Sequence, residues 1–400
     1  MGKKLSEGEN STRNYGLDVL RCIAMIMVVI LHFLDKGGIL RSLSDEGTFT
    51  AADTAAWVLE ALCIVAVNLY MLMSGYLLYS TSFRFSRLLK LVAKVWLYSV
   101  IIGFAGIALG TPGEPVDTYF LLRLILPVSM NTYWFMTAYI FFYLLVPVLG
   151  IAARAMNRSQ MKLLLGGLLF FHVIVKTVVP AQLTADAAGM DAMWYIILFF
   201  TAVYIRRFQG KGRRAAVYFI MYVAGALLIA NEAFLLREVY LKTGSLSYIL
   251  NISYAYNHLL VLFASVSLFC AFLKLRVSEK AGKVFAFLGK YSLGVYLLHE
   301  NLSIRYAWQK LLGCDKATSV ISVLGISIFA GIIVFVTGVI IDWAGSNICG
   351  FALGILKKAP VFKTVAERIS KADKVFAASV TSAGASGKES VRPSDGDSND

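Results

Sequence analysis

Residues 17–33 read LDVLRCIAMIMVVILHF, an apolar run that is interrupted by an arginine, an aspartate and a histidine. A helix needs roughly 20 apolar residues to cross about 30 Å of hydrocarbon, and this run, extended to residue 35, has that length. The polar segment before it and the many apolar runs after it argue against a cleaved signal peptide. We therefore interpret it as the first transmembrane helix.

The rest of the chain repeats this pattern. Of its 400 residues 58% are hydrophobic and 16% are charged, whereas soluble chains carry roughly 45–50% apolar and about 25% charged residues. The sequence therefore predicts an all-α, polytopic membrane helix bundle with about ten transmembrane helices. The ten apolar runs lie near residues 17–35, 56–78, 90–110, 133–152, 160–180, 192–208, 214–231, 255–273, 284–302 and 319–343.

The basic residues predict how this bundle is oriented. If the N-terminus is cytoplasmic, 29 of the 38 Lys and Arg residues lie in inner segments and 9 lie in outer loops. The positive-inside rule then places both termini in the cytoplasm. Topology and anionic membrane lipid account for the net charge of +14, so we expect lipid as a partner and no nucleic acid.

The chain divides into four segments. We expect a cytoplasmic N-terminal segment over 1–16, the transmembrane domain over 17–345, a basic amphipathic juxtamembrane segment over 346–376 and a disordered tail over 377–400. The five cysteines have no metal-type spacing, and we predict no disulfide framework and no metal site.

Arg21 and His32 are the most informative polar residues of the first run. They are eleven positions apart, which is close to three helical turns, so both project from one face about 16 Å apart. Arginine suits phosphates, and histidine suits proton transfer near neutral pH. The alternative is that Arg21 pairs with Asp18 at the interface while His32 hydrogen-bonds a neighbouring helix.

At this pair the chain resembles the acyltransferase 3 family of integral membrane O-acyltransferases, which carries an arginine and a histidine at this spacing in its first span. The resemblance covers residues 15 to 345. It continues in Asn68 to Tyr76 (NLYMLMSGY), in Tyr133-Trp134-Phe135 with Tyr139, Tyr143 and Pro147, in Tyr256-Asn257, and in Ser292 to His299 (SLGVYLLH). Two positions depart from the family pattern: Asn68 replaces a common proline and His258 replaces a common serine.

The resemblance implies a membrane enzyme that transfers an acyl group, acetyl in the simplest case, from cytoplasmic acyl-coenzyme A to a hydroxyl. The implied acceptor is a cell-surface polysaccharide, a glycolipid or a related small molecule, and acyl-coenzyme A is a donor substrate, with no bound cofactor. We expect a multi-pass protein of the bacterial plasma membrane, and the oligomeric state stays open.

In the predicted topology, polar residues of several spans lie at similar depths in the membrane. Arg21, Arg87, Lys90 and Lys94 lie on the inner side, where they would bind the phosphates of acyl-coenzyme A. His32 lies on the outer side and would act as general base or acyl carrier, with Arg21 as a second catalytic candidate. Glu60, at similar depth, is the candidate for orienting the imidazole. The predicted acceptor-binding residues are Trp134, Tyr133, Asn257, His258, Tyr296 and His299.

Simpler interpretations compete with several of these assignments. Trp134 and Tyr133 fit an aromatic belt at the membrane interface. Arg87, Lys90 and Lys94 fit topology determinants, and His172, in the middle of a span, fits a structural histidine.

Two other functions fit the same pattern of spans. A transporter or flippase for a sugar or glycolipid would also use ten spans and intramembrane histidines, although no pair of interrupted spans recurs in the two halves. A catalytically inactive anchor or partner subunit is the third possibility, and the convergence of polar groups speaks against it.

Overall fold

The protein is built from helices, and no strand occurs among the residues that the structure describes. This is a computed structural model, which describes residues 13–356 and 364–375 apart from 80, 82, 180–186, 211 and 246. The prediction of an all-α fold is confirmed. The α-helices are α1 (Tyr15–Lys36), α2 (Ala51–Cys63), α3 (Ala66–Leu78), α4 (Phe85–Ala108), α5 (Thr118–Ile125), α6 (Trp134–Ala155), α7 (Arg158–Leu169), α8 (Lys176–Val178), α9 (Ala192–Phe208), α10 (Ala215–Thr243), α11 (Leu259–Leu273), α12 (Glu279–Lys290), α13 (Ser292–His299), α14 (Trp308–Leu311) and α15 (Val320–Leu356).

Eight helical segments of the described chain are long and apolar enough to cross a membrane. Several of them join two short elements end to end, as α2 and α3 do. The chain is therefore a multi-pass membrane protein. The eight are Tyr15–Lys36, Ala51–Leu78, Phe85–Ala108, Trp134–Ala155, Arg158–Val178, Ala215–Thr243, Ile252–Leu273 and Val320–Cys349.

Two of the ten predicted spans are not among these eight. The run at 192–208 forms α9, whose 17 residues are at the lower end of what spans a bilayer. The run at 284–302 is divided at Tyr291 into α12 and α13, and the helix ends at His299. Helix α13 is mostly buried, whereas α12 leaves Val284 and Phe287 exposed, and a continuous run of apolar residues does not show where one helix ends and the other begins.

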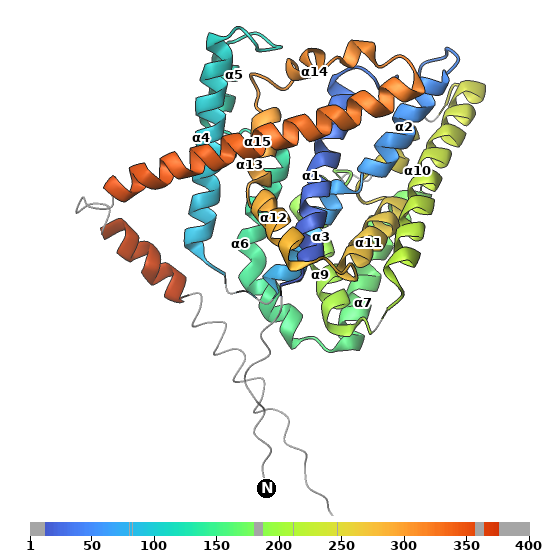
Figure 1. Ribbon diagram of the computed structural model, residues 1–400. Helices are drawn as coiled ribbons and strands as arrows, with labels where there is room; N and C mark the ends of the chain where they lie inside the picture. Colours follow the sequence, from blue (N-terminus) through green and yellow to red (C-terminus); the bar gives the residue numbers. More distant parts are fainter. Residues whose placement is uncertain are drawn as a thin grey trace, which may run out of the picture.

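Helix α1 is the central element of the bundle (Figure 1). It starts at the N-cap Asn14, whose side chain accepts a hydrogen bond from Gly16 N at 3.0 Å. In the most apolar stretch of α1, 67% of the residues are buried inside the protein, compared with 22% in the corresponding stretch of α4. It packs against α2, α3, α11, α12, α13 and α15, so most of its surface meets other helices and not lipid.

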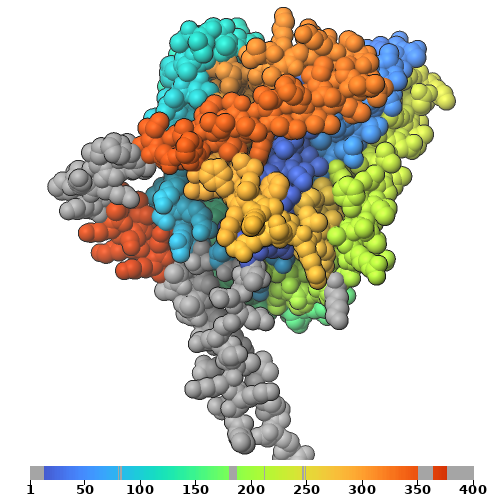
Figure 2. Space-filling view, in the orientation of Figure 1, coloured from blue at the N-terminus to red at the C-terminus, as the bar shows by residue number. Residues whose placement is uncertain are grey.

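Helix α15 lies obliquely across the bundle. Its 37 residues correspond to about 55 Å, more than a helix needs to cross the hydrocarbon upright. It runs as a continuous band over one face and covers α1 and α13 (Figures 1 and 2). Its outward residues, such as Ile321, Phe329 and Ile340, are exposed and apolar, as expected for a lipid-facing helix.

The C-terminal region is described in part. Residues 364–375 form a helix, within the predicted basic segment, and Asp373 Oδ1 accepts a hydrogen bond from Ser86 N at 3.0 Å. This contact attaches the helix to the start of α4. The predicted disordered tail over 377–400 lies outside the described residues.

Candidate active site

His32 of α1 meets two residues at the end of α13. Its Nδ1 lies 2.9 Å from Nε2 of His299 and 3.2 Å from Oε1 of Glu300. The side chain of Glu300 is 8% exposed and that of His32 is 21% exposed. His32 and His299, which are 267 residues apart in sequence, form one polar cluster with Glu300 within the apolar bundle.

The hydrogen bonds determine which ring nitrogens carry protons. His299 Nδ1 lies 2.6 Å from the Val295 carbonyl oxygen. Since a carbonyl only accepts, His299 Nδ1 is the protonated nitrogen and its Nε2 is an acceptor. His32 Nδ1 must then donate to His299 Nε2 and toward Glu300. The remaining nitrogen, Nε2 of neutral His32, is left with a lone pair and can act as a base.

Two cations surround the Glu300 side of this cluster. Lys36, one turn after His32, forms an ion pair with Glu300. Arg305 donates to the carbonyl oxygens of Glu300 at 2.9 Å and Thr132 at 3.1 Å. Sequence reasoning did not select Lys36, Glu300 or Arg305 as site residues. Lys36 carried a usable signal, because residues four apart share one face of a helix.

An apolar cavity of about 200 Å³ begins at His32 and follows α1 toward Arg21. From α1 it is lined by Met25, Val28 and His32, which lie on one face. Its far end includes Tyr70, whose hydroxyl donates to the Arg21 carbonyl oxygen at 2.9 Å. We call it the apolar cavity; His32 lines it, and Arg21 is linked to it through the hydrogen bond between its backbone carbonyl and Tyr70. Its other lining residues include Ser74, Leu91, Trp134, Phe135, Tyr139, Tyr256, Ser292 and Tyr296.

A second, more polar cavity of about 620 Å³ lies on the other side of His32 from the apolar cavity. We call it the polar cavity. It lies where α1 ends and α2 begins, and it contains side chains of the loop between these helices. Its lining includes Asp35, Leu40, Ser42, Leu43, Trp57, Glu60, Lys176, Asn251, Tyr254 and Tyr256.

His32 and Tyr256 line both cavities, as does Leu31. The Tyr256 ring stacks on Trp134 with 5.7 Å between the centroids. Its backbone carbonyl accepts a hydrogen bond from Asn68 Nδ2 at 2.8 Å, and Asn68 Oδ1 accepts one from Trp194 Nε1. The buried Asn68 therefore holds Tyr256, which lies between the two cavities, in place.

The predicted basic residues are distributed unevenly. Arg21 is half-buried and lies 3.6 Å from Asp18, as the simpler interpretation expected. Arg87 and Lys90 are exposed near the start of α4. Lys94 lies deeper and pairs with Asp342 of α15 at 2.6 Å. Three of the four predicted cations thus lie near the Arg21 end, and Lys94 is engaged within the bundle.

Glu60 does not contact His32. The carboxylate beside His32 Nδ1 is that of Glu300. It lines the polar cavity together with His32, and its Oε2 is buried without a hydrogen-bond partner among the described residues. The carboxylate that meets the imidazole comes from the residue directly after α13, next to His299, and not from α2.

The predicted acceptor-binding residues occupy different environments. Trp134 and Tyr296 line the apolar cavity, and His299 contacts His32. Tyr133 is buried, donates to the Leu297 carbonyl at 3.2 Å and accepts from Asn301. Asn257 and His258 are buried directly after Tyr256, and His258 Nε2 lies 3.4 Å from Glu232. Tyr133 and His258 thus contact other parts of the protein.

The geometry also allows a cation at the cluster. Ligand atoms of His32, His299 and Glu300 all lie within 4.8 Å of one another. However, the ammonium group of Lys36 already neutralises Glu300, and a hydrogen bond links the two imidazoles. The separations fit proton-sharing groups, and we interpret the cluster in that way.

A comparison with known protein families gives one match. A family model described as an acyltransferase domain matches residues 14–343, which include every site residue named above. No curated protein and no solved structure matches the chain.

Proposed function

We propose a function from one premise: the chain belongs to the acyltransferase 3 family, whose model covers most of its length. It is accordingly a membrane acyltransferase. We propose that it moves an acyl group, acetyl in the simplest case, from cytoplasmic acyl-coenzyme A to a hydroxyl. The acceptor would be a cell-surface polysaccharide, a glycolipid or a related small molecule, and the membrane would be the bacterial plasma membrane.

The observation that carries the proposal is the place of His32 between two unlike cavities. The apolar cavity suits a thin, uncharged chain such as an acyl-pantetheine arm. The polar cavity suits a hydroxyl-bearing acceptor. A base at their junction reaches a hydroxyl from one cavity and a thioester from the other.

The donor would enter from the end of α1 that carries Arg21. Arg21 and the exposed Arg87 and Lys90 offer cations for the phosphates of coenzyme A. The distance of about 16 Å from Arg21 to His32 along α1 is comparable to an extended pantetheine arm. This assignment makes the Arg21 end the cytoplasmic one, in agreement with the distribution of basic residues in the sequence.

The proposed transfer is a base-catalysed acyl substitution. His32 Nε2 takes the proton of the acceptor hydroxyl, and the oxygen attacks the thioester carbonyl carbon. The tetrahedral intermediate collapses, the carbon–sulfur bond breaks, and the coenzyme A thiolate takes the proton back from His32. Glu300 stabilises the imidazolium formed meanwhile, and His299 keeps the ring oriented.

A variant of this pathway makes His32 the acyl carrier. Nε2 then attacks the thioester itself and releases the thiolate, and the acceptor hydroxyl removes the acyl group in a second step. Single-turnover reaction with labelled acetyl-coenzyme A without acceptor, stopped in denaturant near neutral pH because an acyl-imidazole hydrolyses in acid, distinguishes the two pathways: only the carrier pathway leaves label on the protein.

The test is acyl transfer from radiolabelled acetyl-coenzyme A in lipid nanodiscs, with membrane glycan extract as acceptor. We expect His32→Ala to lower the rate by about 10²- to 10⁴-fold, the usual contribution of a general base. His172→Ala is the matched control, since His172 lies in a different helix and, among the described residues, the hydrogen-bond partner of its ring is the Leu168 carbonyl. Full activity in His32→Ala would refute the proposed mechanism.

A further inference from the structure

The tetrahedral intermediate of the proposed transfer carries a negative charge on the former carbonyl oxygen. In a site within an apolar bundle, such a charge is costly unless a hydrogen-bond donor faces the oxygen. The new bond joins an acceptor oxygen from the polar cavity to a thioester carbon from the apolar cavity, so it forms where the two cavities meet. A donor for the oxyanion must therefore lie at this junction.

Among the described residues, the side chains that line both cavities are those of Leu31, His32 and Tyr256. Leu31 has no donor, and His32 Nε2 is the base that takes the proton of the acceptor hydroxyl. The phenolic hydroxyl of Tyr256 is left. Neighbouring tyrosines line one cavity alone: Tyr296 lines the apolar cavity and Tyr254 lines the polar cavity.

Tyr256 is held by its ring and its backbone, and its hydroxyl is available to a substrate. The ring stacks on Trp134. The backbone N–H donates to the Ala188 carbonyl at 3.0 Å, and the backbone carbonyl accepts from Asn68 Nδ2 at 2.8 Å. Within the described part of the chain, the hydroxyl makes no hydrogen bond. A donor that is fixed before the reaction needs no reorganisation when the charge develops.

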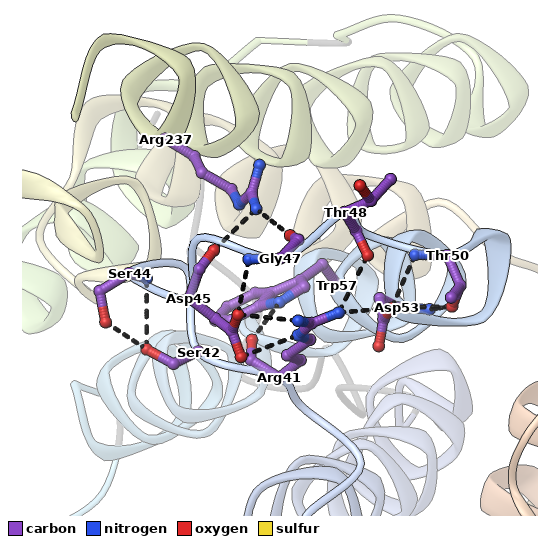
Figure 3. Close-up of polar contacts among 10 residues, drawn as sticks. All are labelled: Arg41, Ser42, Ser44, Asp45, Gly47, Thr48, Thr50, Asp53, Trp57 and Arg237. Carbon is purple, nitrogen blue, oxygen red and sulfur yellow. Dashed lines mark hydrogen bonds and ion pairs between the residues drawn. The ribbon is translucent and has the colours of Figure 1, made fainter. Parts of the chain in front are cut away.

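Cations can also stabilise an oxyanion, but the two arginines beside the polar cavity are engaged in its wall. Figure 3 shows Arg41 directed at Asp45, with contacts of 2.7 and 2.9 Å, and at the Thr48 carbonyl. Arg237 donates to two carbonyl oxygens of the same loop, each at 2.8 Å. These bonds hold the loop over residues 37–50, which supplies part of the lining of the polar cavity, and neither arginine lines a cavity itself.

The cations closer to His32 are placed differently again. Lys36 is paired with Glu300, and Arg305 donates to the Glu300 carbonyl oxygen at 2.9 Å. Lys176 lines the polar cavity and not the apolar one, which puts it on the acceptor side of the junction.

We propose that Tyr256 is a catalytic residue whose hydroxyl donates a hydrogen bond to the oxyanion. As the acceptor oxygen attacks, the π electron pair of the carbonyl moves onto the carbonyl oxygen, and Tyr256 donates to that oxygen while it keeps its own proton. The pair returns to the carbon when the carbon–sulfur bond breaks. This inference rests on the proposed function for its reaction. It holds for both pathways, because each begins with a tetrahedral intermediate on the same thioester carbon.

Tyr256→Phe tests the proposal, because it keeps the ring that stacks on Trp134 and removes the hydroxyl alone. In the nanodisc assay we expect kcat to fall by about 10²- to 10³-fold, the usual effect of removing one oxyanion donor. KM for acetyl-coenzyme A should stay within about twofold, since the contact becomes strong only in the transition state. Tyr204→Phe is the matched control: Tyr204 belongs to α9 and lines neither cavity.

A second substrate separates this role from a structural one. In dithioacetyl-coenzyme A a sulfur atom replaces the carbonyl oxygen, and sulfur accepts hydrogen bonds weakly. The ratio of kcat/KM for the oxygen substrate to that for the sulfur substrate should fall by about tenfold or more from wild type to Tyr256→Phe. A misplaced ring or a partly unfolded sample would lower both rates alike and leave the ratio unchanged. Replacing Tyr256 by 4-aminophenylalanine, which retains a weaker donor, should restore part of the ratio.

The outcomes separate this inference from the proposed function. If wild type is active and Tyr256→Phe keeps the wild-type ratio, the inference is overturned and the proposed function stands. It is also overturned if Tyr296→Phe lowers the ratio in place of Tyr256→Phe, since the donor would then lie within the apolar cavity. If wild type transfers no label from acetyl-coenzyme A, the proposed function fails and this inference fails with it.

Discussion

Lys94 of α4 and Asp342 of α15 form an ion pair, with 2.6 Å between Nζ and Oδ2, and the side chain of Asp342 is only 2% exposed. The hydroxyl of Tyr98, one turn after Lys94, donates to Oδ1 of the same carboxylate at 2.8 Å. Both oxygens of Asp342 are therefore satisfied from α4. The pair attaches the peripheral helix α4 to the band formed by α15.

Breaking this pair should destabilise the fold without a direct effect on chemistry. We expect Lys94→Met to cost up to about 3 kcal/mol, because it leaves a buried carboxylate with one donor fewer. The double variant Lys94→Met/Asp342→Asn should recover part of that loss. Thermal unfolding in detergent measures both, with Lys90→Met, at an exposed position of the same helix, as control. Equal losses in the single and double variants would contradict the interpretation.

His299 should act on the reaction through His32. His299→Phe keeps a ring but removes the acceptor for His32 Nδ1, so the imidazole loses its orientation. We expect kcat to fall by about 10- to 100-fold, the usual effect of a supporting hydrogen-bond partner, while KM for acetyl-coenzyme A stays the same. Steady-state kinetics measure the two constants separately. A rise in KM with unchanged kcat would assign His299 to donor binding instead.

Gly294 allows α13 to lie against α15. A Cβ at this position would lie 2.3 Å from Cβ of Asp342, closer than two carbon atoms can approach. We expect Gly294→Ala to destabilise the protein by about 1–3 kcal/mol, as other overpacked cores do. Gly166→Ala is the control, since nothing lies within 4 Å of its Cβ, and it should be neutral or slightly stabilising. The difference in unfolding temperature between the two variants checks the prediction.

The loop over residues 37–50 should weaken at acid pH. Hydrogen bonds from the Arg41 guanidinium and from Gly47 N lower the pKa of Asp45 from 3.8 to about 2. Because the pKa is lower in the folded state, this carboxylate stabilises the loop above about pH 4, and the contribution disappears as the pH falls toward 2.

Hydrogen exchange of the loop amides, corrected for intrinsic rates, measures this effect. Protection in wild type should decrease between pH 5 and pH 2.5 more than protection in Asp45→Asn does. A parallel decrease in both proteins would show that other groups govern the loop.

The sequence predicted what lies within single helices. Arg21 and His32 share a face of α1 because helical geometry alone places them so. The junction of His32 with Glu300 depends on how α1 packs against α13, and no spacing within either segment encodes it. Glu60 was the prediction at similar depth, but depth does not distinguish one neighbouring helix from another.

The break at Tyr291 could not be predicted for a related reason. The apolar residues continue across the break, although α13 is mostly buried and α12 leaves Val284 and Phe287 exposed, so hydropathy does not mark where one helix ends and the next begins. The length of α9 illustrates a further limit, since an apolar run of 17 residues lies at the lower end of what spans a bilayer.

Because the two cavities meet at His32, the proposed reaction determines which molecule has to cross the membrane. A carrier must change shape to expose its cargo first to one compartment and then to the other. Here, under the proposed function, donor and acceptor each stay on the side from which they arrive. Only the acyl group, two carbon atoms in the case of acetate, changes compartment, and it does so while covalently bound at every moment.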